Sequence, residues 1–202
     1  MSRLLLVRHG RPKLHHDDRF WGATDIPLSD TGIRQAGLLR DRLAGEKIKA
    51  VYASNLSRAR ATAEIIVAGR KLDIAAREEI DECNFGYMEG LTFGEISAQY
   101  PQVARELSDM GTVARFPGGE TFQQLNDRVH AFLDRLGKHR HKDTILVVAH
   151  RSSLQILICY LLGIDVRHWW QLRLDMASLS IIETYPQGAI LNLLNDVSHL
   201  RD

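Results

Sequence analysis

The stretch Leu4-Leu5-Leu6-Val7-Arg8-His9-Gly10 joins a short apolar run to an arginine and a histidine. A second apolar run, Ile145 to Ala149, also ends at a histidine, His150. Apolar runs of this length are typical of buried strands. If both strands lie in one parallel sheet, both histidines emerge at its carboxyl edge, where open α/β sheets bind their ligands. The two runs therefore predict an active site that is assembled from distant parts of the chain.

The rest of the chain alternates short apolar segments with amphipathic helical patterns. This alternation predicts an α/β fold with a mostly parallel sheet flanked by helices. We expect a helix capped by Ser29, a strand over residues 50–53, helices over residues 57–68, 121–138 and 154–162, and a terminal hairpin around Pro186-Gln187-Gly188. The 202 residues, 45% of them hydrophobic, suit one domain over residues 1–202. The least regular stretch, from Phe85 to Phe116, is a candidate lid over the crevice.

The charge balance and the cysteine content limit the possible partners and location of the protein. Because 26 Lys and Arg face 25 Asp and Glu, no overall charge attracts the chain to nucleic acid or to an anionic membrane. No apolar stretch reaches the ~18 to 20 residues that a membrane span needs. The two cysteines, Cys83 and Cys159, form no CxxC pair, so we expect reduced thiols. A cytoplasmic protein without nucleic-acid or membrane partners is the expectation, and the oligomeric state stays open.

The residues at the predicted sheet edge suit phosphoryl transfer. Neutral imidazole is a good nucleophile toward phosphorus, and the transfer needs mainly positioning and positive charge around the phosphoryl oxygens. Arginine supplies that charge in a planar fork that fits phosphate. Arg8 adjoins His9, and Arg58 or Arg60 lies near the start of the helix that follows the strand at 50–53. Helix N-termini also favour anions.

Other polar and aromatic residues favour structural roles. We expect Arg11 and Arg60 to be solvated or paired rather than catalytic. Four adjacent residues cannot easily converge on one metal ion, so His15-His16-Asp17-Asp18 indicates a loop. Trp169 and Trp170 fit packing against the core, with a border of the substrate pocket as the alternative.

Several motifs, in order along nearly the whole chain, resemble the histidine phosphatase or phosphoglycerate mutase-like superfamily. The matching segments are Leu6 to Gly10, Gly22, Asp25 to Ser29, Gly32, Ser54 to Ala63, Glu82 with Phe85-Gly86 and Glu89-Gly90, Pro117 to Glu120, and Val147 to His150. The resemblance implies a metal-independent hydrolase of phosphomonoesters that needs no cofactor and acts on a small phosphorylated metabolite.

The same resemblance implies a role for each site residue. His9 is then the nucleophile that becomes a phosphohistidine, while Arg8, Arg58 and His150 hold the phosphoryl oxygens. Glu82 resembles the general acid, and a carboxyl group beside a phosphate dianion retains a proton more readily. Water then attacks the phosphohistidine.

The chain departs from the family pattern in three places. Arg11-Pro12 replaces a common Glu-Thr or Glu-Ser, and His15 stands where an asparagine that touches phosphate is common. Arg151-Ser152 follows His150, where the family usually has small residues. We expect His15 and Arg151 to contact the substrate. The alternative for Arg151 is that its bulk narrows the pocket and its charge disturbs His150.

Within the superfamily, the segment from Leu157 to Asp175 resembles that of the α-ribazole phosphatases of cobalamin biosynthesis. The expected function is therefore hydrolysis of a phosphomonoester, with α-ribazole phosphate as a candidate substrate. Two alternatives stay open: phosphoglycerate mutase-type phosphoryl transfer, and a module that binds a phosphate ligand with weak catalysis.

Overall fold

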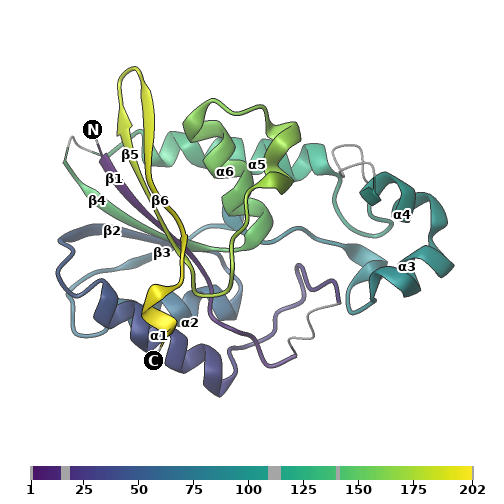
Figure 1. The fold of residues 1–202 in the computed structure, drawn as a ribbon, viewed down its shortest axis with the longest axis horizontal. Helices are drawn as coiled ribbons and strands as arrows, with labels where there is room; N and C mark the ends of the chain where they lie inside the picture. Colours follow the sequence, from purple (N-terminus) through teal and green to yellow (C-terminus); the bar gives the residue numbers. More distant parts are fainter. Residues whose placement is uncertain (1, 15–18, 109–114, 140–141, 202) are drawn as a thin grey trace.

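The computed structural model describes residues 2–14, 19–108, 115–139 and 142–201. His15, with the rest of residues 15–18, lies outside the described residues. In the part that the structure describes, six strands form one sheet in the order β3-β2-β4-β1-β5-β6 (Figure 1). The strands are β1 (Ser2–Arg8), β2 (Ile48–Ala53), β3 (Ile74–Ala76), β4 (Thr144–Ala149), β5 (Leu179–Tyr185) and β6 (Gly188–Asp196). The pairs β3–β2, β2–β4 and β4–β1 are parallel. β5 pairs with β1 in antiparallel orientation, and β6 pairs with β5 in the same way to form a hairpin.

Helices cover both faces of the sheet. α1 (Asp30–Arg42) and α2 (Ser57–Ile66) lie on one face, and α5 (Phe122–Leu136) and α6 (Arg151–Leu162) on the other (Figure 1). α3 (Phe93–Gln99) and α4 (Pro101–Ser108) lie away from the sheet, on the side toward which β1 runs. Local chemistry sets several helix ends. Ser29 Oγ accepts from the Gly32 N–H at 3.1 Å, Thr92 and Thr121 form capping boxes, and Gly163 ends α6 with a φ of 67°.

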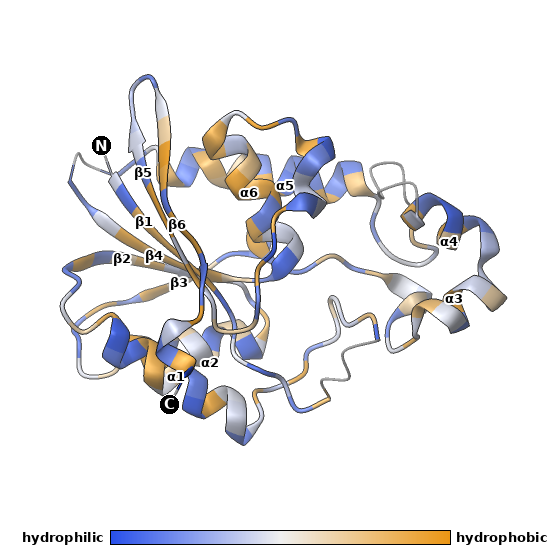
Figure 2. Cartoon of the chain, viewed as in Figure 1, coloured by the Kyte–Doolittle hydropathy of each residue, from blue (hydrophilic) through white to orange (hydrophobic). Residues whose placement is uncertain are grey.

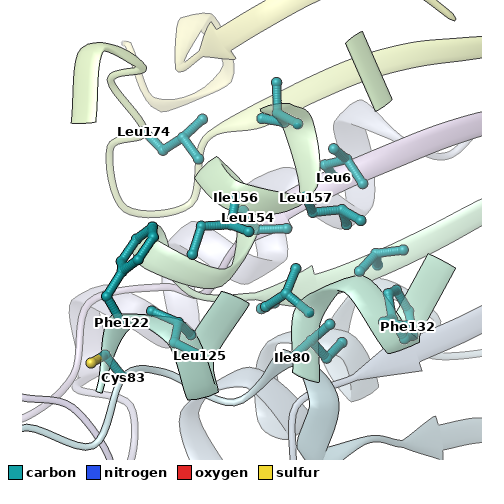
Figure 3. Packing of buried hydrophobic residues seen from close by; sticks show 14 of the residues in the cluster. Leu6, Ile80, Cys83, Phe122, Leu125, Phe132, Leu154, Ile156, Leu157 and Leu174 are labelled. Carbon is teal, nitrogen blue, oxygen red and sulfur yellow. The ribbon is translucent and has the colours of Figure 1, made fainter. Parts of the chain in front are cut away.

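Strand alternation divides the core into two layers. Leu4 and Leu6 of β1 pack into the cluster beneath α5 and α6, whereas Leu5 and Val7 pack into the cluster beneath α1 and α2. β4 is central and buried along its whole length, which explains why its sequence is continuously apolar. Figure 2 shows apolar residues along the strands and a mixture of polar and apolar residues on α1 and α5, and Figure 3 shows Leu6, Leu157 and Phe132 within the first cluster.

The structure confirms the expected α/β architecture and the terminal hairpin. The helices lie where they were expected, with shifted ends: α2 ends at Ile66 rather than at residue 68, α5 ends at Leu136 rather than at residue 138, and α6 begins at Arg151 rather than at residue 154. The stretch from Phe85 to Phe116 contains α3 and α4, two helices that the sequence pattern did not indicate, and its role as a lid remains a prediction. Cys83 and Cys159 are buried free thiols, as expected. Among the described residues, no helix has the length and apolar character to cross a membrane.

Truncation of β4 tests this core. Leu146 is fully buried, so we expect Leu146→Ala to lower the free energy of unfolding by about 3 kcal/mol, through lost burial and a residual cavity. Leu38 is 42% exposed on α1, and Leu38→Ala makes the same change at the surface. Urea denaturation monitored by circular dichroism measures both variants. Equal losses in the two variants would contradict the assignment of β4 to the core.

Candidate active site

The end of β1 fixes the position and the tautomer of His9. Its backbone N–H donates to the carbonyl of Ala149 at 3.0 Å, and its carbonyl accepts from Ala177 N–H at 3.0 Å. The ring Nδ1 lies 2.7 Å from the carbonyl oxygen of Gly10. Because a carbonyl oxygen only accepts, Nδ1 carries the proton, and Nε2 of the neutral ring keeps its lone pair. In this tautomer, His9 can offer Nε2 to an electrophile.

His150 follows β4 and lies beside His9. The parallel register pairs Arg8 with Ala149, so the two histidines leave neighbouring strands at the same level, with ring centroids 4.9 Å apart. His150 is fully buried, and this burial, together with the charge of Arg58, lowers its pKa well below the usual value. In the ligand-free protein, His150 is therefore neutral at pH 7.

Two arginines, the half-buried Arg8 and the buried Arg58, flank the histidines. Arg8 donates to the carbonyl of Leu174 at 2.7 Å, and burial lowers its pKa to about 10, so it stays cationic at neutral pH. Arg58, the second residue of α2, is 2% exposed, and burial also lowers its pKa. Its guanidinium donates to the carbonyls of Thr24 and Gly22 at 2.8 and 2.6 Å. Both guanidiniums thus reach the site on fixed side chains.

Glu89 holds the loop that orients Arg58. Its carboxylate accepts from the N–H groups of Gly22, Ala23 and Thr24 at 3.0, 2.9 and 3.1 Å. It also accepts from the N–H of Phe85 at 3.1 Å. Any side chain at position 22 would clash, because a Cβ there would lie 1.8 Å from the Cys83 carbonyl oxygen. The sequence motif contained Glu89, but sequence reasoning gave it no role.

Glu82 lies between the arginines and the start of α6. It is 7% exposed, and its Oε1 accepts from the N–H groups of Cys83 and Ser152 at 2.9 and 3.3 Å. Arg128 of α5 clamps the segment that carries Glu82, since it donates to the carbonyls of Asp81 and Glu82 at 2.6 and 3.0 Å. Arg128 also pairs with Glu120 at 2.7 Å. No sequence pattern indicated this role for Arg128.

A cavity of about 710 Å³ opens beside these residues. Arg8, Glu82, Arg151 and Ser152 contribute to its polar lining. The apolar lining is largely aromatic and consists of Phe20, Trp21, Phe85, Phe93, Leu107, Phe116, Phe122, Leu125, Trp169 and Trp170, with Cys83 among them. The expected site therefore continues into a space that can hold an apolar organic group.

Of the remaining candidate residues, some line the cavity and others lie outside it. Arg151 starts α6, is exposed and lines the cavity. Trp169 and Trp170, in a short 3-10 helix (Val166–Gln171), border the cavity, and Trp169 also packs on Phe122 at 5.9 Å between ring centroids. Arg11 and Arg60 are exposed and outside the cavity lining. His15 cannot be placed, because it lies outside the described residues.

The described side chains suit an anionic phosphoryl group. Two imidazoles and two guanidiniums converge, and within residues 2–14, 19–108, 115–139 and 142–201 no group of three or more His, Cys, Asp or Glu residues could hold a metal. An arrangement of this kind can bind a phosphoryl group, attack its phosphorus and protonate a leaving oxygen.

Comparisons with known proteins agree with this chemistry. The family model of the histidine phosphatase superfamily (branch 1) matches residues 4–197. The chain is 31% identical to phosphoserine phosphatase 1 of Hydrogenobacter thermophilus, over 99% of this chain and 95% of the relative. It is 32% identical to the adenosylcobalamin/α-ribazole phosphatase of Escherichia coli, over 96% and 95% of the two chains.

Solved structures show the same fold. The crystal structure of the α-ribazole phosphatase from Shigella flexneri superposes with a TM-score of 0.89 at 30% identity, over 96% of each chain. Bacillus stearothermophilus YhfR superposes with a TM-score of 0.90 at 29% identity, over the whole of both chains. The chain thus belongs to the histidine phosphatase superfamily, with a phosphoglycerate mutase-like fold, and is a phosphatase.

Proposed function

We propose that this protein hydrolyses phosphomonoesters of small metabolites through a phosphohistidine on His9. The observation that carries the proposal is the contact between His9 Nδ1 and the Gly10 carbonyl oxygen, because it leaves the Nε2 lone pair for attack. Nε2 bonds to phosphorus as the bond from phosphorus to the ester oxygen breaks. Arg8, Arg58 and His150 surround the phosphoryl oxygens and stabilise their charge.

Glu82 completes the cycle in this proposal. Its protonated carboxyl group gives a proton to the leaving alkoxide, so the product departs as a neutral alcohol. The resulting carboxylate then takes a proton from the water that attacks the phosphohistidine, which restores His9 and the acid and releases phosphate. The proposal is supported by the burial of Glu82 and by the position of its carboxylate at the start of α6, in the cavity lining.

Removal of the nucleophile tests the covalent mechanism. We expect His9→Ala to abolish phosphate release from an aryl phosphate, whereas wild-type release persists in EDTA, because His9 is the attacking group and no metal takes part. Circular dichroism and thermal unfolding check that the variant folds. If the folded variant keeps more than a few per cent of wild-type activity, the assignment of His9 is wrong. Release from neither protein would favour a phosphate-binding module.

A second variant tests the general acid. We expect Glu82→Gln to lower kcat/KM for alkyl phosphates about 100-fold and for aryl phosphates about 10-fold or less, because aryl oxides leave without a proton. Steady-state kinetics with a series of leaving groups measures the difference. Equal losses across the series would remove the proton-donor role from Glu82 and leave it a purely structural residue.

The cavity favours a substrate whose alcohol part carries an aromatic ring. Eight of its lining residues are aromatic, and the Trp169 and Trp170 side chains border it together. The benzimidazole of α-ribazole phosphate would bury its ring there, with the phosphate against Arg8. One relative carries α-ribazole phosphatase in its name. We therefore take α-ribazole phosphate as the first candidate substrate.

Arg151 supports a second candidate of the phosphoserine type. Its exposed guanidinium lines the cavity close enough to Arg8 to lower the pKa of that residue, and no described residue pairs with it. A carboxylate on the alcohol part of a substrate could bind this charge. Another relative carries phosphoserine phosphatase in its name.

Two variants separate the candidates. If the aromatic substrate is correct, Trp170→Ala lowers kcat/KM for α-ribazole phosphate about 10-fold and leaves phosphoserine unchanged. If the carboxylate substrate is correct, Arg151→Gln lowers kcat/KM for phosphoserine by a similar factor of about 10. Arg167→Gln is the matched control, because Arg167 is exposed and outside the cavity lining. Uniform effects on both substrates would contradict both assignments.

A further inference from the structure

Ser54, the residue after β2, connects His150 to a carboxylate that the proposed mechanism does not use. The side chain of Ser54 is fully buried. Its Oγ donates to Asp81 Oδ1 at 2.6 Å, accepts from the Leu56 N–H at 3.1 Å, and lies 2.7 Å from His150 Nε2. Asp81 Oδ1 also accepts from the Asn55 N–H at 2.7 Å. A continuous chain of short hydrogen bonds therefore runs from Asp81 to the imidazole.

This chain fixes the tautomer of His150. A serine hydroxyl has one proton to donate, and Ser54 gives it to Asp81. The contact with His150 must then use a proton on the ring, so Nε2 carries the hydrogen and Nδ1 of the neutral ring has the lone pair. The tautomer of His150 is thus opposite to that of His9, whose Nδ1 donates to Gly10.

We propose that Asp81 is a positioning residue that acts through Ser54, holding His150 as the Nε2–H tautomer and stabilising a second proton on Nδ1 when a phosphate dianion binds. The inference rests on the proposed function, because it takes the phosphoryl site to lie beside His150. When phosphate binds, a proton from solvent bonds to Nδ1 of His150, and this proton returns to solvent when phosphate departs. Asp81 and Ser54 keep their own protonation states.

The charges around His150 explain why the proton arrives only with the ligand. Complete burial lowers the pKa of His150 most, and the charges of Arg58, Arg8 and Arg128 lower it further. The carboxylates of Asp81, Glu82, Asp25 and Glu89 act on Arg58, and those of Glu82 and Asp175 act on Arg8. Of these, Asp81 contacts the His150 ring through Ser54. A phosphate dianion adds two negative charges to this cationic group and shifts the balance toward the imidazolium.

The pH dependence follows from that proton. Since phosphate binding includes proton uptake at His150, phosphate affinity falls as the pH rises above the pKa of this residue in the free protein. Removal of the Asp81 charge lowers that pKa further, so the affinity falls at neutral pH. At pH 5 the difference shrinks, because the imidazole protonates more readily in both proteins and burial raises the pKa of Asp81 itself.

Nitrogen-15 NMR of the histidine side chains tests the proposal in the full chain with inorganic phosphate as the probe. The His150→Asn variant assigns the His150 signals. We expect the Nε2–H tautomer without phosphate at pH 7.5 and a doubly protonated ring with saturating phosphate. In Asp81→Asn, the Asn Oδ1 can still accept from Asn55 and Ser54, so the loop is retained. The bound ring should then protonate only at a pH about one unit lower, with phosphate affinity about 10-fold weaker at pH 7.5.

Asp134→Asn is the matched control, because Asp134 is exposed on α5 and its loss removes the same charge without the contact to Ser54. We expect it to behave as wild type. Ser54→Ala should reproduce the effect of Asp81→Asn and also allow the Nδ1–H tautomer. An Nδ1–H tautomer in wild type, or an unchanged titration in folded Asp81→Asn, would overturn the role of Asp81. If phosphate perturbs neither His9 nor His150, the proposed phosphate site itself is wrong.

Discussion

The parallel pairing of β1 with β4 is the constraint on which the rest of the site depends. It places Arg8 opposite Ala149, so that His9 and His150 leave adjacent strands at one level and their rings approach within 4.9 Å. The hydrogen bond from the His9 N–H to the Ala149 carbonyl continues the ladder for one more residue. Both strands are buried on two faces, so a shift in register would move apolar side chains across the sheet as well as separate the histidines. The same strand register therefore determines both the packing of the core and the geometry of the site.

The two arginines of this site donate their hydrogen bonds to neutral backbone carbonyls. Arg58 donates to two backbone carbonyls and Arg8 to a third, and no described carboxylate hydrogen-bonds either guanidinium. A buried cation without a hydrogen-bonded counterion is costly, and part of that cost is recovered when an anion binds. The carboxylates near the site instead fix the scaffold: Glu89 orders the loop beneath Arg58, and Glu120 anchors Arg128. This division keeps the cations rigid while leaving their charge for a phosphoryl group.

Sequence reasoning reached the parts of this molecule that depend on local pattern. Apolar runs ending in histidine indicated both strands and their meeting point, and Ser29 marked the start of α1 through its capping side chain. The clamp by Arg128 could not be predicted, because it joins α5 to carbonyls about 47 residues away, and carbonyls are common to every residue. α3 and α4 were not predicted for a different reason. They are short, and their apolar residues face the cavity and each other rather than the sheet.

The arrangement separates bond cleavage from choice of substrate. The proposed phosphoryl site lies at the ends of β1 and β4 and the start of α2, elements whose position the core determines. The aromatic lining comes largely from segments outside the sheet, the stretch 85–116 and the 3-10 helix at Val166–Gln171. Changes in the aromatic residues of these segments can alter the shape of the cavity without moving His9, because among the described residues neither segment has a main-chain hydrogen bond to His9. Glu89, within the first segment, is the exception, since it holds the loop beneath Arg58. A shared fold among phosphatases named for different substrates, such as phosphoserine and α-ribazole phosphate, is the physical consequence of that separation.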